Sequence, residues 1–267
     1  MPAIQPARLR QQAALVVQSF AEPPVFIRSL HHLFEFYADR AKRPGMVGEP
    51  QPLLAAYHLR PPVLRQILLE LTPLAQQSPQ AALTLADALW EQPYVEFRTL
   101  AASLLGLVPA LSPDLIFSRL ETWIDLSTES QLVEALLEQG LARIRKEQMD
   151  FLLMKIADWL ASPDGFHQRL GLRALLPIIA DPAFDNLPIS FRLITPFVRS
   201  APSSVRPALL NVLAALAHRS PMETAFFLRE SLTMSDSPDV PWMIRQSLHQ
   251  FPSEIQQNLR AAMRSMD

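Results

Sequence analysis

Two apolar stripes with helical spacing lie on either side of Pro93. The residues that form them are Leu85, Leu89 and Trp90 before the proline and Phe97, Leu100, Ala101, Leu104 and Leu105 after it. Apolar residues at intervals of three and four positions give a helix one hydrophobic face. The pattern therefore predicts a helical hairpin, and such a hairpin buries its faces only when similar hairpins stack on either side.

The same pattern continues along the whole chain and predicts about fourteen helices. Their expected ranges are 6–20, 24–42, 61–77, 79–91, 94–110, 113–126, 128–146, 147–161, 163–180, 187–199, 203–219, 221–233, 238–249 and 252–265. The 25 prolines and 6 glycines favour short helices with rigid corners over strands joined by glycine turns. The expected fold class is all-α, an α-α superhelix with repeats of roughly 35 to 40 residues.

Serine and proline mark the expected helix starts. Five Ser-Pro pairs each predict an N-cap followed by a first-turn proline: Ser78-Pro79, Ser112-Pro113, Ser162-Pro163, Ser220-Pro221 and Ser237-Pro238. Residues 128–131 and 220–223 also match the capping-box pattern. Pro73 and Pro177 fall inside helical patterns and predict a kink or a division there. Residues 43–60, rich in proline and glycine, predict a longer loop.

A single domain over 1–267 is the expected organisation. Within it, residues 1–60 form an N-terminal helical pair and loop, 61–186 the central repeats, and 187–267 the C-terminal repeats and a polar cap. The sequence has neither a long uncharged apolar run nor a signal-peptide pattern, so we expect no membrane association and a cytoplasmic location. There is no cysteine, which excludes disulfides and thiolate metal sites.

Known site motifs are missing from the sequence. The six histidines show no HExxH spacing, and we expect the adjacent His31 and His32 to lie on the surface. No phosphate loop, dinucleotide fingerprint, G-x-S-x-G elbow or carboxylate-rich metal loop is present. We therefore expect no metal, no cofactor and no nucleotide enzyme.

Charge is unevenly distributed. The formal net charge is −2, which argues against an indiscriminate nucleic-acid binder. Residues 1–60 carry a net +3, residues 61–140 a net −7 and residues 141–267 a net +2. A DNA-binding surface would therefore have to be a local row of arginines.

Three segments together resemble one family. They are residues 57–65 (YHLRPPVLR), 90–105 (WEQPYVEFRTLAASLL) and 162–173 (SPDGFHQRLGLR). Their order and spacing are similar to those of the HEAT-like helical-repeat DNA alkylation repair glycosylases of the AlkD type. His58 stands where that family has a glycine. The resemblance implies a HEAT-like repeat solenoid that binds double-stranded DNA along a concave face.

The resemblance also implies a site. Enzymes of that family excise alkylated purines with a tryptophan, a carboxylate four residues later and an arginine; Glu134 matches the carboxylate and Arg169 the arginine. Ser130 stands at the tryptophan position, and the loss of the aromatic face removes about 0.5 to 2 kcal/mol of attraction for a cationic base. Trp123, with Asp125 beside it, is the alternative aromatic group. However, residues at positions i and i+2 of a helix point to different faces. We therefore favour a packing role for Trp123.

Other aromatic and charged groups have simpler interpretations beside the functional ones. Trp90, in an apolar helix, is expected to pack between helices, as large buried tryptophans do. Glu96 and Arg98 are expected to pair with each other or with exposed backbone groups. Three basic residues lie in the last turn of a predicted helix, where their positive charges interact favourably with the helix dipole: Arg143, Arg145 and Lys146.

The later repeats offer five arginines for a phosphate-binding row: Arg169, Arg173, Arg199, Arg206 and Arg245. The alternative is that they lie on solvated helix faces. Two functional hypotheses follow. One is a DNA-binding protein of alkylation repair, with N-glycosidic bond hydrolysis open; the other is a non-catalytic HEAT-repeat scaffold that holds a protein partner on its concave face.

Overall fold

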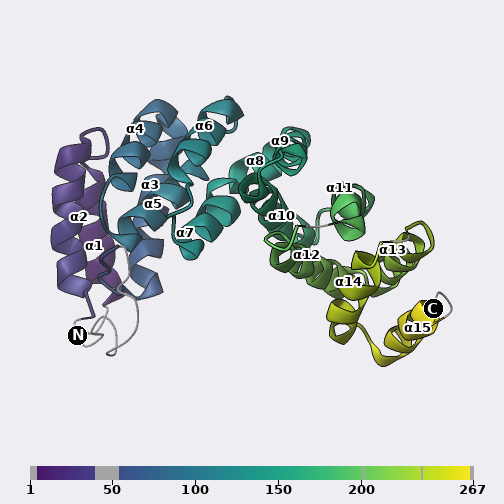
Figure 1. Cartoon of the computed structure of the whole chain (residues 1–267). Helices are drawn as coiled ribbons and strands as arrows, with labels where there is room; N and C mark the ends of the chain where they lie inside the picture. The colour runs from purple at the N-terminus through teal and green to yellow at the C-terminus, as the bar shows by residue number, and fades with distance from the viewer. Residues whose placement is uncertain (1–4, 40–53, 201, 236, 265–267) are drawn as a thin grey trace. The chain divides into compact units, whose positions relative to one another are not determined.

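The computed structural model describes residues 5–39, 54–200, 202–235 and 237–264 (Figure 1). The protein is 77% helical, and no strand occurs in the described ranges. The expected all-α fold is therefore confirmed. The elements are α1 Pro6–Val17, α2 Pro23–Tyr37, α3 Pro61–Gln77, α4 Pro79–Trp90, α5 Val95–Leu105, α6 Pro113–Trp123, α7 Ser130–Ala135, the π-helical turn η1 Leu136–Gly140, α8 Ala142–Glu147, α9 Met149–Ala161, α10 Gly165–Ala180, α11 Leu187–Arg199, α12 Arg206–Arg219, α13 Pro221–Thr233, α14 Asp239–Ser247, the 3-10 turn η2 Leu248–Gln250 and α15 Ser253–Arg264.

Proline sets most of the helix starts. Helices α3, α11 and α13 have the bounds that the sequence predicts, and each has a proline in its first turn. This agreement has a physical cause, because a first-turn proline fixes φ near its helical value and lacks only an N–H that the helix leaves unpaired. Ser78, Ser112 and Ser220 stand at N-caps as expected, although none of their hydroxyls makes a capping hydrogen bond.

Several capping predictions are wrong. Helix α10 begins at Gly165 and is capped by Asp164, whose carboxylate accepts a hydrogen bond from the Phe166 backbone N–H. Ser162, the expected cap, instead accepts from the Asp164 N–H. Helix α7 begins after Glu129, and the Thr128 hydroxyl is engaged with Asp125 and the Trp123 carbonyl. At α10, an aspartate carboxylate is at least as good a cap as serine, so the helix starts after Asp164 and not after Ser162.

Internal prolines do not divide the helices that contain them. Pro73 lies inside α3 and Pro177 inside α10, and both helices continue past the proline. Pro196 is a third internal proline, in α11. Each proline removes one backbone hydrogen bond from its helix.

Contacts between helices group the chain into two compact units, Met1–Met149 (unit 1) and Asp150–Asp267 (unit 2). The boundary falls inside the range 61–186 that the sequence suggests is one array. The single-domain organisation stays a prediction, and each unit is described by itself.

In unit 1 the helices form two layers. Helices α1, α3, α5 and α7 with η1 follow one another in the first layer, and α2 packs on α4 in the second. The α5–η1 contact is especially close. Gly106, which ends α5, faces the Gln139 backbone carbonyl, and the Ser103 hydroxyl donates a hydrogen bond to the Gln139 side chain. A side chain on Gly106 would have no room.

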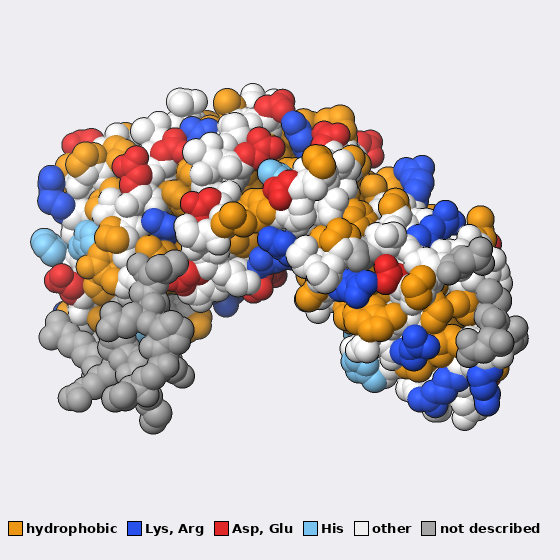
Figure 2. Space-filling view, viewed as in Figure 1, with side chains coloured by type: hydrophobic (Ala, Val, Ile, Leu, Met, Phe, Trp, Pro, Cys, Tyr) orange, Lys and Arg blue, Asp and Glu red, His pale blue; other side chains and the backbone are white. Residues whose placement is uncertain are grey.

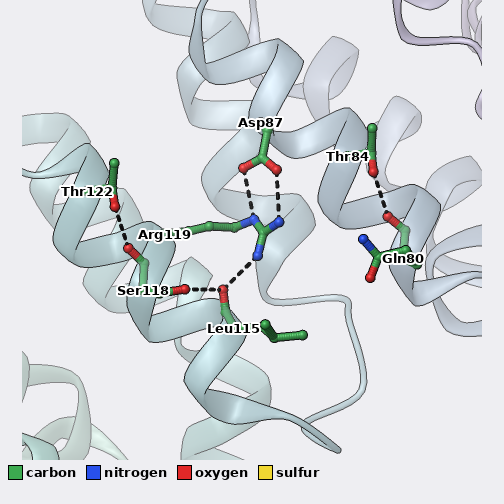
Figure 3. A network of polar contacts seen from close by, with 7 residues as sticks. All are labelled: Gln80, Thr84, Asp87, Leu115, Ser118, Arg119 and Thr122. Carbon is green, nitrogen blue, oxygen red and sulfur yellow. Dashed lines mark hydrogen bonds and ion pairs between the residues drawn. The ribbon is translucent and has the colours of Figure 1, made fainter.

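An ion pair joins α4 to α6 in unit 1 (Figure 3). Arg119 Nε and Nη2 donate to the two carboxylate oxygens of Asp87 at 2.8 and 2.9 Å, and Nη1 donates to the Leu115 carbonyl at 2.8 Å. The fork of a guanidinium matches a carboxylate in this bidentate geometry. The pair fixes the alignment of two successive helices of the second layer.

Unit 2 repeats the two-layer arrangement. Helix α12 packs between α10 and α14 in one layer, and α13 packs between α11 and α15 in the other. Helix α9 pairs with α10, where Gly171 allows close approach to the Leu160 side chain. Helices α10, α12 and α14 therefore lie side by side in the first layer.

Candidate nucleic-acid interface

The N-terminal ends of α10, α12 and α14 adjoin one another. A methyl group on Gly165, the first residue of α10, would lie 3.3 Å from Ser204 Oγ in the turn before α12. Arg206, the first residue of α12, pairs with Asp239, the first residue of α14, at 2.6 Å between Nη2 and Oδ1. We call this row of three helix starts the N-terminal edge of unit 2.

Two arginines of this edge lie over aromatic rings. The Arg169 guanidinium carbon is 6.0 Å from the centre of the Phe166 ring, and that of Arg206 is 4.9 Å from the Trp242 ring. Both arginines are half-buried. A ring holds a guanidinium in place while leaving its outer N–H groups open to an acceptor.

The helix starts also favour negative charge. The first N–H groups of a helix have no partner inside the helix and carry a positive partial charge. Asp164 uses this field at α10. Its hydrogen bond from the Phe166 N–H, together with His167 Nδ1 at 2.8 Å, holds the pKa of its carboxyl below the ordinary value. A row of such helix starts with cationic side chains attracts phosphate as well as carboxylate.

The remaining arginines of the expected row are placed differently. Arg173 lies one turn after Arg169 on α10 and is half-buried, and Arg245 is exposed on α14. Arg199 lies in the last turn of α11, in the other layer of unit 2. The structure therefore brings together Arg169 and Arg206, places Arg173 and Arg245 on helices of the same layer, and separates Arg199 from them.

Glu134 lies in unit 1. It is exposed on α7, whose first residue is Ser130, two residues after the start of the expected range 128–146. The π-helical turn η1 follows Ala135 directly, and π-helical turns are frequent at functional sites. Glu134 lies in unit 1 and Arg169 lies in unit 2.

The two tryptophans of unit 1 pack on each other. Trp90 and Trp123 stack with ring centres 4.7 Å apart and planes 7° apart, and they are 8% and 9% exposed. The Asp125 carboxylate turns away to Ser127 and Thr128, and these hydrogen bonds lower its pKa. The packing interpretation of both tryptophans is confirmed, and Trp123 does not replace the missing groove tryptophan.

Glu96 and Arg98 bind backbone groups rather than each other. Glu96 Oε1 accepts from the Leu59 N–H at 3.4 Å, and Arg98 Nε donates to the Gln92 carbonyl at 3.3 Å. Arg98 also lies 5.1 Å over the Trp90 ring. Of the two expectations for this pair, the one that involves the backbone is confirmed.

Unit 1 contains an aromatic cluster that no pattern in the sequence indicates. His31, which we expected on the surface, is half-buried, and its Nδ1 lies 2.7 Å from the Tyr57 hydroxyl. Tyr57 stacks on Tyr94 at 4.8 Å, and Phe97 lies 4.5 Å from the His31 ring. Burial and the hydrogen bond with Tyr94 raise the pKa of Tyr57 well above its ordinary value. The rings come from α2, the 54–60 segment and α5, so only tertiary packing assembles them.

His58, next to this cluster, has the left-handed backbone angle φ of 53°. Glycine adopts this conformation without strain, whereas histidine does so at a cost. The one signal in the sequence was His58 itself, because it stands where the resembling family has glycine. The segment keeps the backbone geometry of the motif without the residue that makes it easy.

Charge separates the two units on the face shown in Figure 2. Asp and Glu side chains predominate over unit 1, whereas Lys and Arg side chains gather over unit 2. Among the described residues, no group of three or more His, Asp or Glu could hold a metal ion. In the same residues no helix is long and apolar enough to cross a membrane.

Comparison with known proteins gives one match. A family model described as DNA alkylation repair enzyme matches residues 33–251, which is most of the chain. Neither the curated proteins nor the solved structures gave a match. The matched range includes Tyr57, Tyr94 and Phe97 of the aromatic cluster, Glu134 and the whole N-terminal edge of unit 2.

Proposed function

We propose that this chain, which belongs to the DNA alkylation repair enzyme family, binds double-stranded DNA through the N-terminal edge of unit 2. The observation that carries the proposal is the adjacency of Arg169 and Arg206 on neighbouring helix starts, each arginine seated on an aromatic ring. Membership of the family supports a role in DNA repair, and the edge is where this chain's own residues favour phosphate.

Phosphate contact at this edge has a simple physical basis. A guanidinium donates two parallel hydrogen bonds to one phosphate, and unpaired N–H groups of a helix start add to its attraction. Arg206 forms an ion pair with Asp239, so its positive charge attracts a phosphate less strongly than that of Arg169. Arg169 is therefore the principal phosphate ligand in this proposal, with Arg173 and Arg245 at its flanks.

Excision of an alkylated purine is the finer part of the proposal. This reaction hydrolyses the N-glycosidic bond. The bond between the sugar C1′ and the purine nitrogen breaks, and its electron pair leaves with the base. Water then adds at C1′ and loses a proton. Glu134 is the group that we assign to steady the developing positive charge on the sugar and to orient the water. Because Ser130 supplies no aromatic face, we expect the reaction to rely on lesions whose positive charge already weakens that bond.

The binding test compares Arg169→Ala with Arg229→Ala, a control that removes an exposed arginine of α13 from the other layer of unit 2. Arg169→Ala should weaken binding to a fluorescent duplex by about 1–2 kcal/mol and lower the salt slope by about one phosphate, with little change in melting temperature. The control should change neither. A sharp fall in melting temperature with unchanged affinity per folded molecule would make Arg169 a structural residue. The absence of affinity for DNA at low salt would contradict the proposal and favour the scaffold hypothesis.

The excision test measures release of a methylated purine from duplex DNA. We expect release above buffer for the natural chain and buffer-level release for Glu134→Gln, which keeps the size of the side chain but removes its charge. Arg229→Ala should release as the natural chain does. Release at the buffer rate by a folded, DNA-binding natural chain would remove the excision part and leave the binding part standing.

A further inference from the structure

The second layer of unit 2 carries an open apolar pocket of about 470 Å³ between α11 and α13. Its apolar lining is formed by Pro188, Phe191, Met222, Phe226 and Phe227. Phe191 and Phe227 form the contact between the two helices, with ring centres 5.0 Å apart. The volume lies within the range of pockets that bind drug-sized groups, so it can receive two large side chains of a partner.

Two residues at the mouth of this pocket leave apolar surface in water. Met222 is 71% exposed and Phe226 is 54% exposed. They lie four residues apart on α13 and therefore on one face of the helix. Single exposed apolar residues are common, whereas a group of them beside a pocket is typical of a binding surface.

Two carboxylates define the charge of the pocket. Glu223 and Glu230 both line it, and both are exposed. They lie seven residues apart, which is two turns or about 10.5 Å along the helix. Successive residues turn by about 100°, which places both between Phe226 and Phe227 around the helix. Arg229 falls on the other side of Phe226, away from α11, and does not line the pocket.

We propose that this pocket docks a protein segment that forms a basic amphipathic helix. Two bulky apolar side chains one turn apart would fill the space beside Phe191, Phe226 and Phe227, and Lys or Arg residues about two turns apart would pair with Glu223 and Glu230. The same carboxylates repel the phosphates of DNA and of anionic lipid. The pocket lies in the α11–α13 layer, so the partner would leave the N-terminal edge of α10, α12 and α14 open.

The test uses two designed peptides with the full-length chain. Both are 14-residue helices with Leu at positions 6 and 10; one has Lys at positions 2 and 9, beside the Leu face, and the other has Glu there. In fluorescence anisotropy at physiological salt, the chain should bind the Lys peptide at least tenfold more tightly than the Glu peptide. Glu223→Lys with Glu230→Lys should reverse this preference, and Phe226→Ala should weaken binding of the Lys peptide at least tenfold. Arg229→Ala is the matched control and should leave it unchanged.

Several results would overturn the proposal. One is the absence of measurable binding of either peptide. Another is binding of the Lys peptide that both Phe226→Ala and the double charge reversal leave unchanged, because the peptide would then occupy the acidic surface of unit 1. A third is concentration-dependent dimerisation of the peptide-free chain that Phe226→Ala abolishes, because the occupant would then be a second copy.

Discussion

The two units use arginine in different ways. In unit 1, Arg119 is only 18% exposed. Its Nε and Nη2 donate to Asp87 and its Nη1 to the Leu115 carbonyl, so its charge serves to align α4 with α6. In unit 2, Arg169 lies over Phe166 at the start of α10, with its guanidinium 3.8 Å from where a methyl group on Gly165 would lie. The first holds the stack together, and the second presents charge at an edge.

The comparison shows that a similar helical stack can serve two purposes. Unit 1 has its aromatic rings inside, as the Trp90–Trp123 stack and the cluster around Tyr57 demonstrate. Unit 2 has several at its borders, where Phe166, Trp242 and Phe226 meet cations or water. In the proposed function, the phosphate-binding arginines therefore lie in unit 2, and the proposed catalytic carboxylate, Glu134, lies in unit 1.

The largest effect should come from breaking the tryptophan stack of unit 1. Trp90→Ala removes a buried ring that contacts both Trp123 and Arg98, and we expect a loss of about 3–5 kcal/mol in the free energy of unfolding. Urea denaturation followed by circular dichroism measures it. Trp242→Ala in unit 2 is the counterpart and should cost less stability but weaken DNA binding. Equal stability losses and unchanged DNA affinity in both variants would erase the distinction between the units.

A smaller effect should separate two glycines. Gly106→Ala in unit 1 places a methyl group inside the van der Waals contact distance of the Gln139 carbonyl oxygen, so the backbone of η1 must move, at a cost of about 1–3 kcal/mol. Gly165→Ala in unit 2 has the Ser204 hydroxyl, at 3.3 Å, as the nearest neighbour of its methyl group and should cost far less. Thermal unfolding of both variants gives the comparison. A tolerated Gly106→Ala would show that the α5–η1 contact is loose.

A gain in stability is expected from His58→Gly. Glycine relieves the left-handed backbone strain of His58 but is more flexible in the unfolded chain, and we expect a net gain of about 0.5–1 kcal/mol in chemical denaturation. The substitution of the exposed neighbour Arg60→Ala serves as the control. Lower stability of His58→Gly would mean that the His58 side chain itself contributes a contact worth more than the strain.

The smallest effect concerns two aspartates, one in each unit. Hydrogen bonds hold the pKa of Asp125 and that of Asp164 below the ordinary value of about 3.9. Their contribution to stability is therefore present above this value and is lost as the pH falls through the lowered pKa. Asp125→Asn and Asp164→Asn should each lower the melting temperature slightly at pH 7, and this difference should shrink steadily as the pH falls below about 3.9. A difference that stays constant with pH would show that the charge plays no part.

The sequence predicts the helices well because the signals that start them are local. Proline in the first turn places α3, α11 and α13. The local signal fails where two caps compete, as at Ser162 and Asp164. It also gives no sign that the helical pattern near Leu136 contains a π-helical turn.

The candidate site is less predictable because it depends on neighbours in space. The sequence selects Arg169 and Arg206, but only packing shows that α10 and α12 start side by side and that Asp239 shares the second arginine. Arg199 resembles the others in sequence and lies in the other layer. Which arginine faces which partner depends on the phase of each helix against the next, and single-chain periodicity does not encode that phase.

The π-helical turn η1 also determines which way the residues after it face. A π-helical turn holds one more residue than an α-helical turn. Side chains after Leu136–Gly140 are therefore rotated by about one residue, roughly 100°, from the direction that an unbroken α-helix would give them. Ser130 and Glu134 precede the turn and keep the phase of α7. A helical wheel drawn through the whole predicted range 128–146 would therefore misplace the side chains of α8.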